Sequence, residues 1–232
     1  MKAPLLLTSA LALLASTVLS SATVLVSLDT AAPTDYFANS TAAAGGIQWR
    51  NDTVNGRRDV GQSFFTPTAL TLEKFTLQFT ADASPGAGAS NAAFTLSLYQ
   101  VASASAVPTA GTAILTETGV LPTFQSSDMG KYITFDMANT ALAANSYYAL
   151  ILTFNTQAAA ENIIFRISNT PASYPGGQAI ISTDGTTFSS YSTGADFVFY
   201  ATAVPEPGTV ALAVVAFVSL VPVLRRKLHP VA

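Results

Sequence analysis

The chain has 232 residues, of which half are apolar and 10% are charged, and its formal net charge is −3. It contains no Cys, which excludes disulfides, thiolate metal sites and cysteine nucleophiles. Its one His, His229, lies in the extreme C-terminal tail, so the body has no imidazole for a Ser-His-Asp triad or for a His-ligated zinc or iron. Many of the basic residues lie in the terminal segments, which leaves the body acidic and argues against nucleic-acid binding.

The N-terminal segment has the three-part pattern of a secretory signal peptide. Lys2 gives a positive start, residues 5–19 are apolar, and Ser20–Ala22 supplies small residues before a cleavage site. The apolar run is shorter than a comfortable membrane span of about 20 residues. We therefore predict that residues 1–22 are a signal peptide and that the mature chain starts at Thr23.

Residues 23–203 are predicted to form one extracellular β-domain. Apolar and polar residues alternate with a period of two in several short segments, and Gly, Pro, Asn and Ser separate them. The segment 147–154 is nearly continuously apolar, as in a central strand covered on both faces. Asp184-Gly185 marks a hairpin turn. The predicted strands, at 71–80, 94–99, 131–136, 147–154, 163–167, 180–182, 187–188 and 196–200, favour an all-β, antiparallel β-sandwich that is jelly-roll-like.

A polar stretch near residue 50 holds the candidate ligand-binding residues. Its carboxylate and amide side chains are of the kind that calcium accepts, although the spacing differs from that of an EF-hand. Arg57 and Arg58 would weaken cation binding there, and the alternative is a polar turn. No other metal and no cofactor is indicated. The candidate residues are Trp49, Asn51, Asp52, Asn55 and Asp59.

Two features of the same stretch have two interpretations each. Trp49, the single Trp, is either a stacking platform for a sugar ring or a core residue of the sandwich. Arg50, Arg57 and Arg58 form a small basic cluster that is either a solvated loop or an anion site.

The C-terminal segment has a different order of signals. Pro205-Glu206-Pro207 precedes an apolar run, residues 209–224, and Arg225-Arg226-Lys227 follows it directly. A helix over this run would be about 24 Å long, close to the thickness of a hydrocarbon core, and the basic residues would hold its end in the cytoplasm. Pro205 and Pro207 predict an extended segment that joins neither a helix nor a sheet. A plain transmembrane anchor is the alternative to a sorting signal.

Residues 204–232 resemble the PEP-CTERM sorting signal in the order and terminal position of these parts. The resemblance implies that an exosortase, an integral membrane protease, recognises Pro205, Glu206 and Pro207 and removes the helix. It also implies a transient inner-membrane precursor. The mature protein would then lie at the cell surface or in the extracellular matrix of a Gram-negative bacterium that makes exopolysaccharide.

The body resembles the choice-of-anchor R group of surface domains. The matching segments, in order, are 60–66, a following Leu-Thr strand, 96–99, Gly111-Thr112 with Leu115, and 142–148. The resemblance implies a β-sandwich at the cell surface and assigns no chemistry to it.

The leading hypothesis is a non-enzymatic surface or matrix protein, structural or adhesive, in contact with exopolysaccharide or biofilm. One alternative is a lectin-like, calcium-dependent carbohydrate-binding module. Another is a glycoside hydrolase, which needs only two carboxylates across a cleft. No catalytic residue is assigned.

Overall fold

The computed structural model describes residues 23–34, 37–40, 45–83, 85–159, 161–168, 174–192 and 194–205. The predicted signal peptide, Glu206, Pro207, the predicted helix at 209–224 and the basic residues Arg225, Arg226 and Lys227 lie outside this part of the chain. Among the described residues, no helix has the length and apolar character that crossing a membrane requires.

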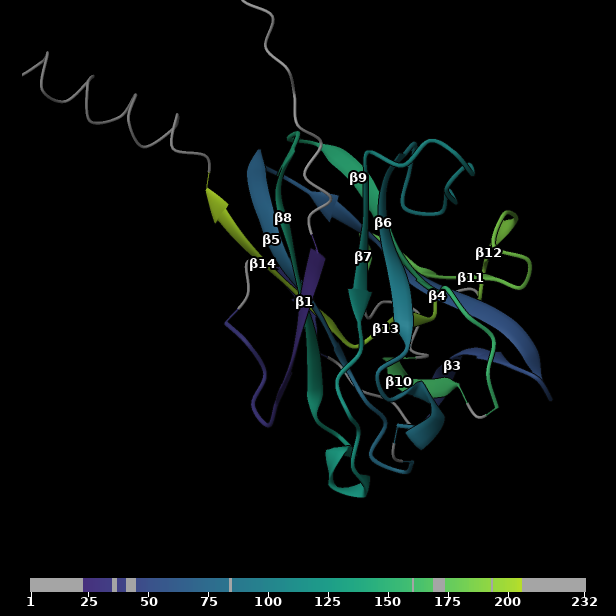
Figure 1. The fold of residues 1–232 in the computed structure, drawn as a ribbon. Helices are drawn as coiled ribbons and strands as arrows, with labels where there is room; N and C mark the ends of the chain where they lie inside the picture. Colours follow the sequence, from purple (N-terminus) through teal and green to yellow (C-terminus); the bar gives the residue numbers. More distant parts are fainter. Residues whose placement is uncertain are drawn as a thin grey trace, which may run out of the picture.

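Strands make up most of the described chain, which confirms the predicted all-β class (Figure 1). Two single-turn 3-10 helices, η1 (Ala87–Ala89) and η2 (Ser126–Asp128), lie in the connections. The first seven strands are β1 (Thr23–Asp29), β2 (Phe37–Asn39), β3 (Gly46–Asp52), β4 (Gly56–Thr66), β5 (Leu70–Gln78), β6 (Ala93–Val101) and β7 (Leu115–Val120). The others are β8 (Tyr132–Leu142), β9 (Ser146–Phe154), β10 (Asn162–Ser168), β11 (Ala179–Ser182), β12 (Phe188–Ser190), β13 (Asp196–Phe197) and β14 (Phe199–Pro205).

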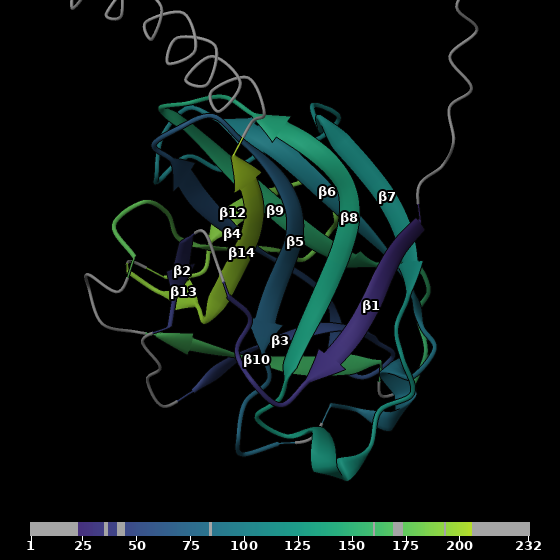
Figure 2. The ribbon, with the colours of Figure 1, turned by 90° about the vertical axis from the view of Figure 1, so that its left-hand side faces the viewer.

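The strands form one large mixed sheet that curls back on itself (Figure 2). Its order is β13-β10-β3-β4-β9-β6-β7-β1-β8-β5-β14-β2, with β11 and β12 attached at β4. Strand β1 makes the corner, because Thr23 and Val24 pair in parallel with β7 before Leu25 to Asp29 pair antiparallel with β8. An isolated bridge between Phe79 and Phe165 joins the end of β5 to β10. The predicted purely antiparallel sandwich of two separate sheets is therefore not confirmed.

Strand β9 is the central strand that its apolar sequence predicts. It pairs with β4 along one edge and with β6 along the other. Tyr148 to Leu152 are all buried, so both faces of the strand are covered. The predicted hairpin at Asp184-Gly185 is also confirmed, since Ser182 of β11 pairs with Phe188 of β12.

Stacked aromatic rings fill the space inside the curl. Trp49 of β3 is fully buried, and its ring lies 4.0 Å from that of Phe154 and 6.0 Å from that of Phe165, centroid to centroid. Phe165 in turn stacks on Phe79 at 5.8 Å. Side chains from β9, β3, β10 and the end of β5 thus form one continuous stack.

Pro205 differs from its prediction. It is the last residue of β14 and lies opposite Leu70 of β5, so the expectation that it stays outside the sheet is wrong. Strand β2 pairs with β14 only at Phe199 to Ala201, which leaves the other edge of the final residues unpaired within the described chain. A proline without an N–H is accommodated at such an edge.

Replacing Trp49 with alanine tests its place in the stack. Trp49→Ala is expected to lower the free energy of unfolding by about 3–5 kcal/mol, because it removes a large buried ring and leaves a cavity. Urea unfolding followed by circular dichroism measures the change. The control is Val54→Ala at a residue that is 86% exposed, where a change of no more than about 0.5 kcal/mol is expected. Equal effects of the two substitutions would contradict the core placement.

Candidate functional site

The candidate residues at 49–59 lie on the β3–β4 hairpin, and the carboxylate of Asp52 closes its turn. Asp52 Oδ1 accepts hydrogen bonds from the backbone amides of Val54, at 2.9 Å, and Asn55. The Asn55 side chain donates to the other oxygen of Asp52 at 3.2 Å. The bond from the Asn55 backbone amide, with the others, holds the pKa of Asp52 below its ordinary value, against the effect of burial. Gly56 completes the turn with a φ of 72°, which favours glycine.

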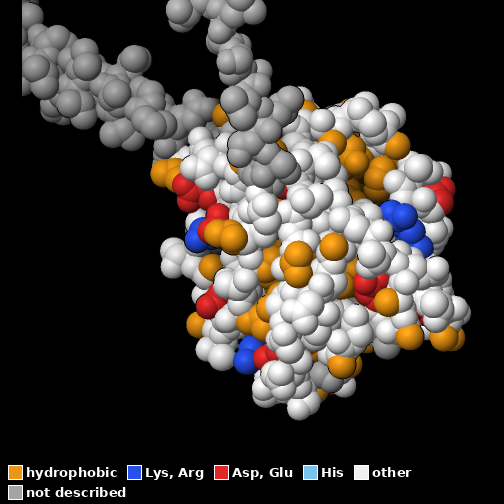
Figure 3. All heavy atoms as spheres, in the orientation of Figure 1, with side chains coloured by type: hydrophobic (Ala, Val, Ile, Leu, Met, Phe, Trp, Pro, Cys, Tyr) orange, Lys and Arg blue, Asp and Glu red, His pale blue; other side chains and the backbone are white. Residues whose placement is uncertain are grey.

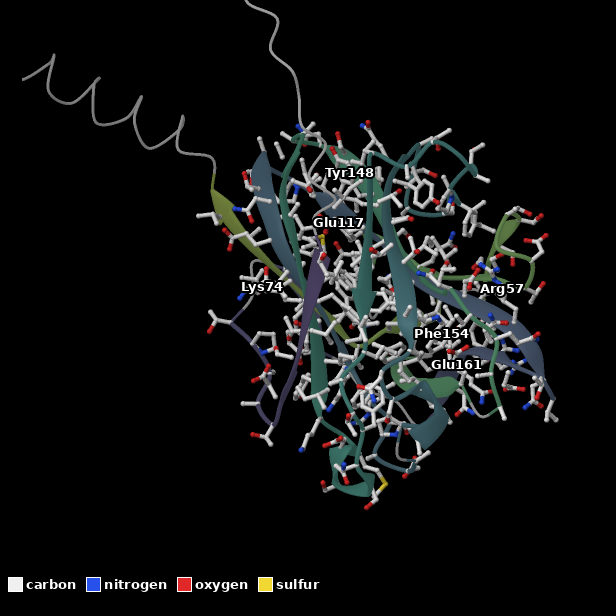
Figure 4. The ribbon with its side chains drawn as sticks, viewed as in Figure 1. Arg57, Lys74, Glu117, Tyr148, Phe154 and Glu161 are labelled. Carbon is white, nitrogen blue, oxygen red and sulfur yellow. The ribbon has the colours of Figure 1, made fainter. Side chains whose placement is uncertain are left out.

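Asn51 points toward a different neighbour, the loop that precedes β10. Its side-chain amide donates to the carbonyl of Thr156, and its backbone amide donates to the carbonyl of Glu161 at 3.0 Å. Glu161 lies beside β3 (Figure 4), is 2% exposed, and accepts a hydrogen bond from the Thr156 hydroxyl at 2.9 Å. Burial raises the pKa of Glu161.

Asp59 is bound by Arg57. The Nε of Arg57 lies 2.9 Å and 3.1 Å from the two oxygens of Asp59, and its Nη2 lies 2.9 Å from one of them. Burial raises the pKa of Asp59, while Arg57 acts in the opposite direction. Asp184 lies near enough for its charge to act on Asp59, but its own Oδ1 accepts from the backbone amides of Thr186 and Thr187.

The structure therefore does not gather the sequence candidates around one ligand. Asp52 and Asn55 bond to each other, Asn51 bonds to a loop, and Asp59 bonds to Arg57. Trp49 is fully buried and has no exposed face for a sugar, which agrees with the core interpretation. In the described part of the chain, no group of three acidic or histidine side chains is arranged to hold a metal ion.

Other buried carboxylates also have structural partners. Both oxygens of Glu117 lie within hydrogen-bonding distance of the Ala138 backbone amide, at 3.0 and 3.2 Å. Asp128 accepts from Lys131 at 2.8 Å and from the Gln125 backbone amide at 2.7 Å. Asp196 accepts from the Gln62 side chain at 2.8 Å. These acids fix loops and strands.

A surface hollow of about 450 Å³ lies where β11 approaches the loop after β6, away from the sequence candidates. The lining is uncharged and consists of small residues and one amide side chain. The Gln178 side chain donates to the Ser105 carbonyl at 2.9 Å, and a Cβ on Gly177 would collide with the carbonyl of Ser63. The lining residues are Ala104, Ser105, Gly177, Gln178, Ser190 and Gly194.

Tyr191 follows one of the lining residues directly and is partly exposed. Its backbone amide donates to the carbonyl of Ala179 in β11 at 2.9 Å. Its phenol is near enough to Arg58 for the two groups to interact electrostatically. No motif in the sequence marks the hollow, because its lining comes from three separate segments.

Comparisons with known proteins leave the chain without a family. No family model and no curated protein matches it. Two solved structures of Cwp84, a surface layer associated protein of Clostridium difficile, resemble its fold weakly. One contains cysteine protease and lectin-like domains; it is 11% identical, with a TM-score of 0.41, over 71% of this chain and 37% of that one. The other is the protease after propeptide cleavage, at 12% identity and a TM-score of 0.40, over 71% and 41%. This chain thus spans less than half of either structure, and likeness at this level assigns no function.

The buried Glu161 predicts a pH-dependent stability. The pKa of Glu161 is raised in the folded protein. Its contribution to the free energy of unfolding is therefore most favourable below the ordinary pKa of glutamate, about 4.3, and declines as the pH rises. Glu161→Gln should therefore unfold at a higher temperature than the unsubstituted protein at pH 7. The advantage should shrink as the pH falls toward about 4. Calorimetry across this range measures both trends.

The matched control is Asp82→Asn, which neutralises an exposed carboxylate. Its unfolding temperature should follow that of the unsubstituted protein at each pH. A Glu161→Gln variant that is less stable at pH 7, or a difference that does not depend on pH, would contradict the assignment.

Proposed function

We propose that this chain is a non-enzymatic surface or matrix protein, structural or adhesive, that contacts exopolysaccharide. The observation that supports it is the uncharged hollow, whose lining includes the hydroxyl groups of Ser105 and Ser190 and the amide of Gln178. Sugar hydroxyl groups both donate and accept hydrogen bonds, which suits such a lining. Tyr191, which follows Ser190 directly and lies near Arg58, offers an exposed aromatic ring for stacking on a sugar.

The carboxylates favour binding over hydrolysis. A glycoside hydrolase needs one acid that carries a proton and another that stays ionised. Asp59 and Asp184 are near each other, but the guanidinium of Arg57 binds both oxygens of Asp59, and the amides of Thr186 and Thr187 donate to Asp184 Oδ1. The residues that line the hollow include no carboxylate. A lectin-like module that does not need calcium remains within this proposal.

The geometry of the described chain ends suits display from a tether. Leu25 of β1, Asp136 of β8, Lys74 of β5 and Thr202 of β14 lie opposite one another in turn. Because each of these pairings is antiparallel, β1 and β14 run in opposite directions. The first residue of β1 and the last residue of β14, Pro205, therefore lie toward the same end of the sheet. Strands β3 and β10 lie far from the end of β14 in both ribbon views (Figures 1 and 2).

The charge distribution fits contact with a hydrated polymer. Charged side chains on the face drawn in Figure 3 are few and scattered among uncharged polar groups. We include in this proposal the export route that the sequence suggests, with a signal peptide ending at Ala22 and a PEP-CTERM-type signal at Pro205, Glu206 and Pro207.

Cell fractionation tests the export route. In wild-type cells, the mature protein is expected at the surface or in the medium, without Arg225, Arg226 and Lys227. In cells that lack the exosortase, the protein should retain these residues and stay in the inner membrane. Mass spectrometry of the C-terminal peptide distinguishes the two forms. An identical C-terminus in both strains would refute sorting by the exosortase.

Affinity electrophoresis in gels that contain the producing strain's exopolysaccharide tests binding at the surface around Ser190 and Tyr191. Tyr191→Ala is expected to weaken binding by roughly five- to tenfold, because a stacked aromatic contact contributes about 1 kcal/mol. Leu25→Ala is the control, since Leu25 is 69% exposed on a distant strand. Equal retardation of the Tyr191 variant and the unsubstituted protein would contradict the placement of the site.

A further inference from the structure

The described basic residues divide into two groups of three. Arg57, Lys74 and Lys131 form ion pairs with Asp59, Asp136 and Asp128 at 2.8 to 3.1 Å. The others have no ion-pair partner among the described residues: Arg50, Arg58 and Arg166. This is unexpected in a body where residues 23–203 contain twelve acidic and six basic side chains.

The three unpaired arginines lie on one face of the sheet. Arg50 of β3 is directly opposite Arg58 of β4. Arg166 of β10 is opposite Gly46, four residues before Arg50 on the same strand. Because side chains alternate along a strand and paired residues share a face, all three project to the same side.

Burial shows that this is the outer side of β3 and β10, while Arg58 itself is partly buried at the end of β4 that pairs with β3. Ile47, Trp49, Ile163 and Phe165 point into the core and are completely buried. The alternate residues Gln48, Arg50, Asn162, Ile164 and Arg166 are only partly buried, whereas Asp52 and Ser168, at the strand ends, are buried. Besides Arg50 and Arg166, this face carries the amide side chains of Gln48 and Asn162, which is opposite Arg50.

The Arg50–Arg58 pair costs free energy without an anion. Like charges directly opposite each other on neighbouring strands repel. Burial and the charge of Arg50 lower the pKa of Arg58. The Nε atoms of both arginines are buried and make no hydrogen bond within the described residues. The charge of Arg50 also lowers the pKa of Asp52, but the Asp52 carboxylate already accepts hydrogen bonds from Val54 and Asn55 in its own turn.

We propose that Arg50 and Arg58 form a clamp for the carboxylate groups of an acidic polysaccharide. The planar fork of a guanidinium group matches a carboxylate, and an anion held between two such groups removes their repulsion. Arg166, about 13 Å further along the strand direction, provides a second point of contact for a linear polymer. This inference rests on the proposed function and adds the charge of the ligand to it.

The clamp and the hollow lie along the same strand, β4, but on opposite faces, because Arg58 and Ser63, whose hydroxyl bonds to the carbonyl of Ala104, are five residues apart. Strand β3 pairs with β4 up to Arg58, and β11 continues along β4 from Asp59. Tyr191, which follows the lining residue Ser190 in sequence, lies near Arg58 at this junction.

The test measures binding of the mature protein to polygalacturonate by calorimetry, with neutral dextran and dextran sulfate as comparison polymers. Arg58→Gln is expected to weaken binding to polygalacturonate about tenfold, because it removes charge-assisted hydrogen bonds, and Arg50→Gln with Arg58→Gln should weaken it further. Added salt should weaken binding by the unsubstituted protein. Arg58→Lys keeps the positive charge but loses the guanidinium fork, so its affinity for polygalacturonate should lie between those of the unsubstituted protein and Arg58→Gln.

The matched control is Lys74→Gln, which also removes one positive charge. Lys74 and Arg57 lie on opposite sides of the molecule (Figure 4), and the Lys74–Asp136 pair is exposed. The affinity of the Lys74→Gln variant for polygalacturonate should stay within about twofold of that of the unsubstituted protein, because exposed ion pairs contribute little. The fluorescence of Trp49 checks that each variant is folded, and removing one of two opposed charges should not lower the unfolding temperature.

Each contrary outcome has a distinct meaning. Equal weakening by Arg58→Gln and Lys74→Gln would overturn the clamp in favour of a general charge effect. Tighter binding to dextran sulfate, or arginine-dependent binding to duplex DNA that exceeds binding to polygalacturonate, would overturn the choice of carboxylate ligand. Binding to the strain's exopolysaccharide that survives the double substitution would overturn the clamp and leave the proposed function standing. Failure of the unsubstituted protein to bind any polysaccharide would overturn both.

Discussion

The aromatic stack that runs from Phe154 through Trp49 and Phe165 to Phe79 determines much of this structure. It joins side chains of β9, β3 and β10 with the end of β5, and the bridge between Phe79 and Phe165 lies at its end. A sheet that curls must bury its concave face, and rings from distant strands fill that space at near-crystalline density. The stack also fixes which side of β3 faces outward. Because Trp49 and its neighbour two residues before it point inward, Arg50 must point out.

The sequence predicted local features of this fold better than their assembly. The apolar run at 147–154 correctly indicated the central strand β9, and Asp184-Gly185 correctly placed the β11–β12 hairpin. Both signals depend on neighbouring residues. The corner at β1 and the curl of the sheet depend on pairing between distant segments, which no local pattern records. Pro205 was placed outside the sheet because proline lacks a donor, yet at an unpaired edge no donor is needed.

At the candidate site, too, the sequence indicated local features but not how distant residues come together. The residues at 49–59 were a reasonable choice from composition, but in the structure their polar groups hold one hairpin and its neighbouring loop together. Arg57 and Arg58 are adjacent in sequence, but successive side chains on a strand face opposite sides. Arg57 binds Asp59, and Arg58 lies opposite Arg50. Arg166 is more than a hundred residues from both in sequence. Only the register of β10 on β3 places it on the same face.

Modification of arginines by a dicarbonyl reagent, read by mass spectrometry, tests the outward-facing clamp most directly. In the free protein, Arg50 and Arg58 should react faster than Arg57, which is bound to Asp59. Polygalacturonate should protect Arg50 and Arg58, and neutral dextran should not. Unchanged reactivity of both arginines in the presence of polygalacturonate, at concentrations that saturate binding, would contradict this account.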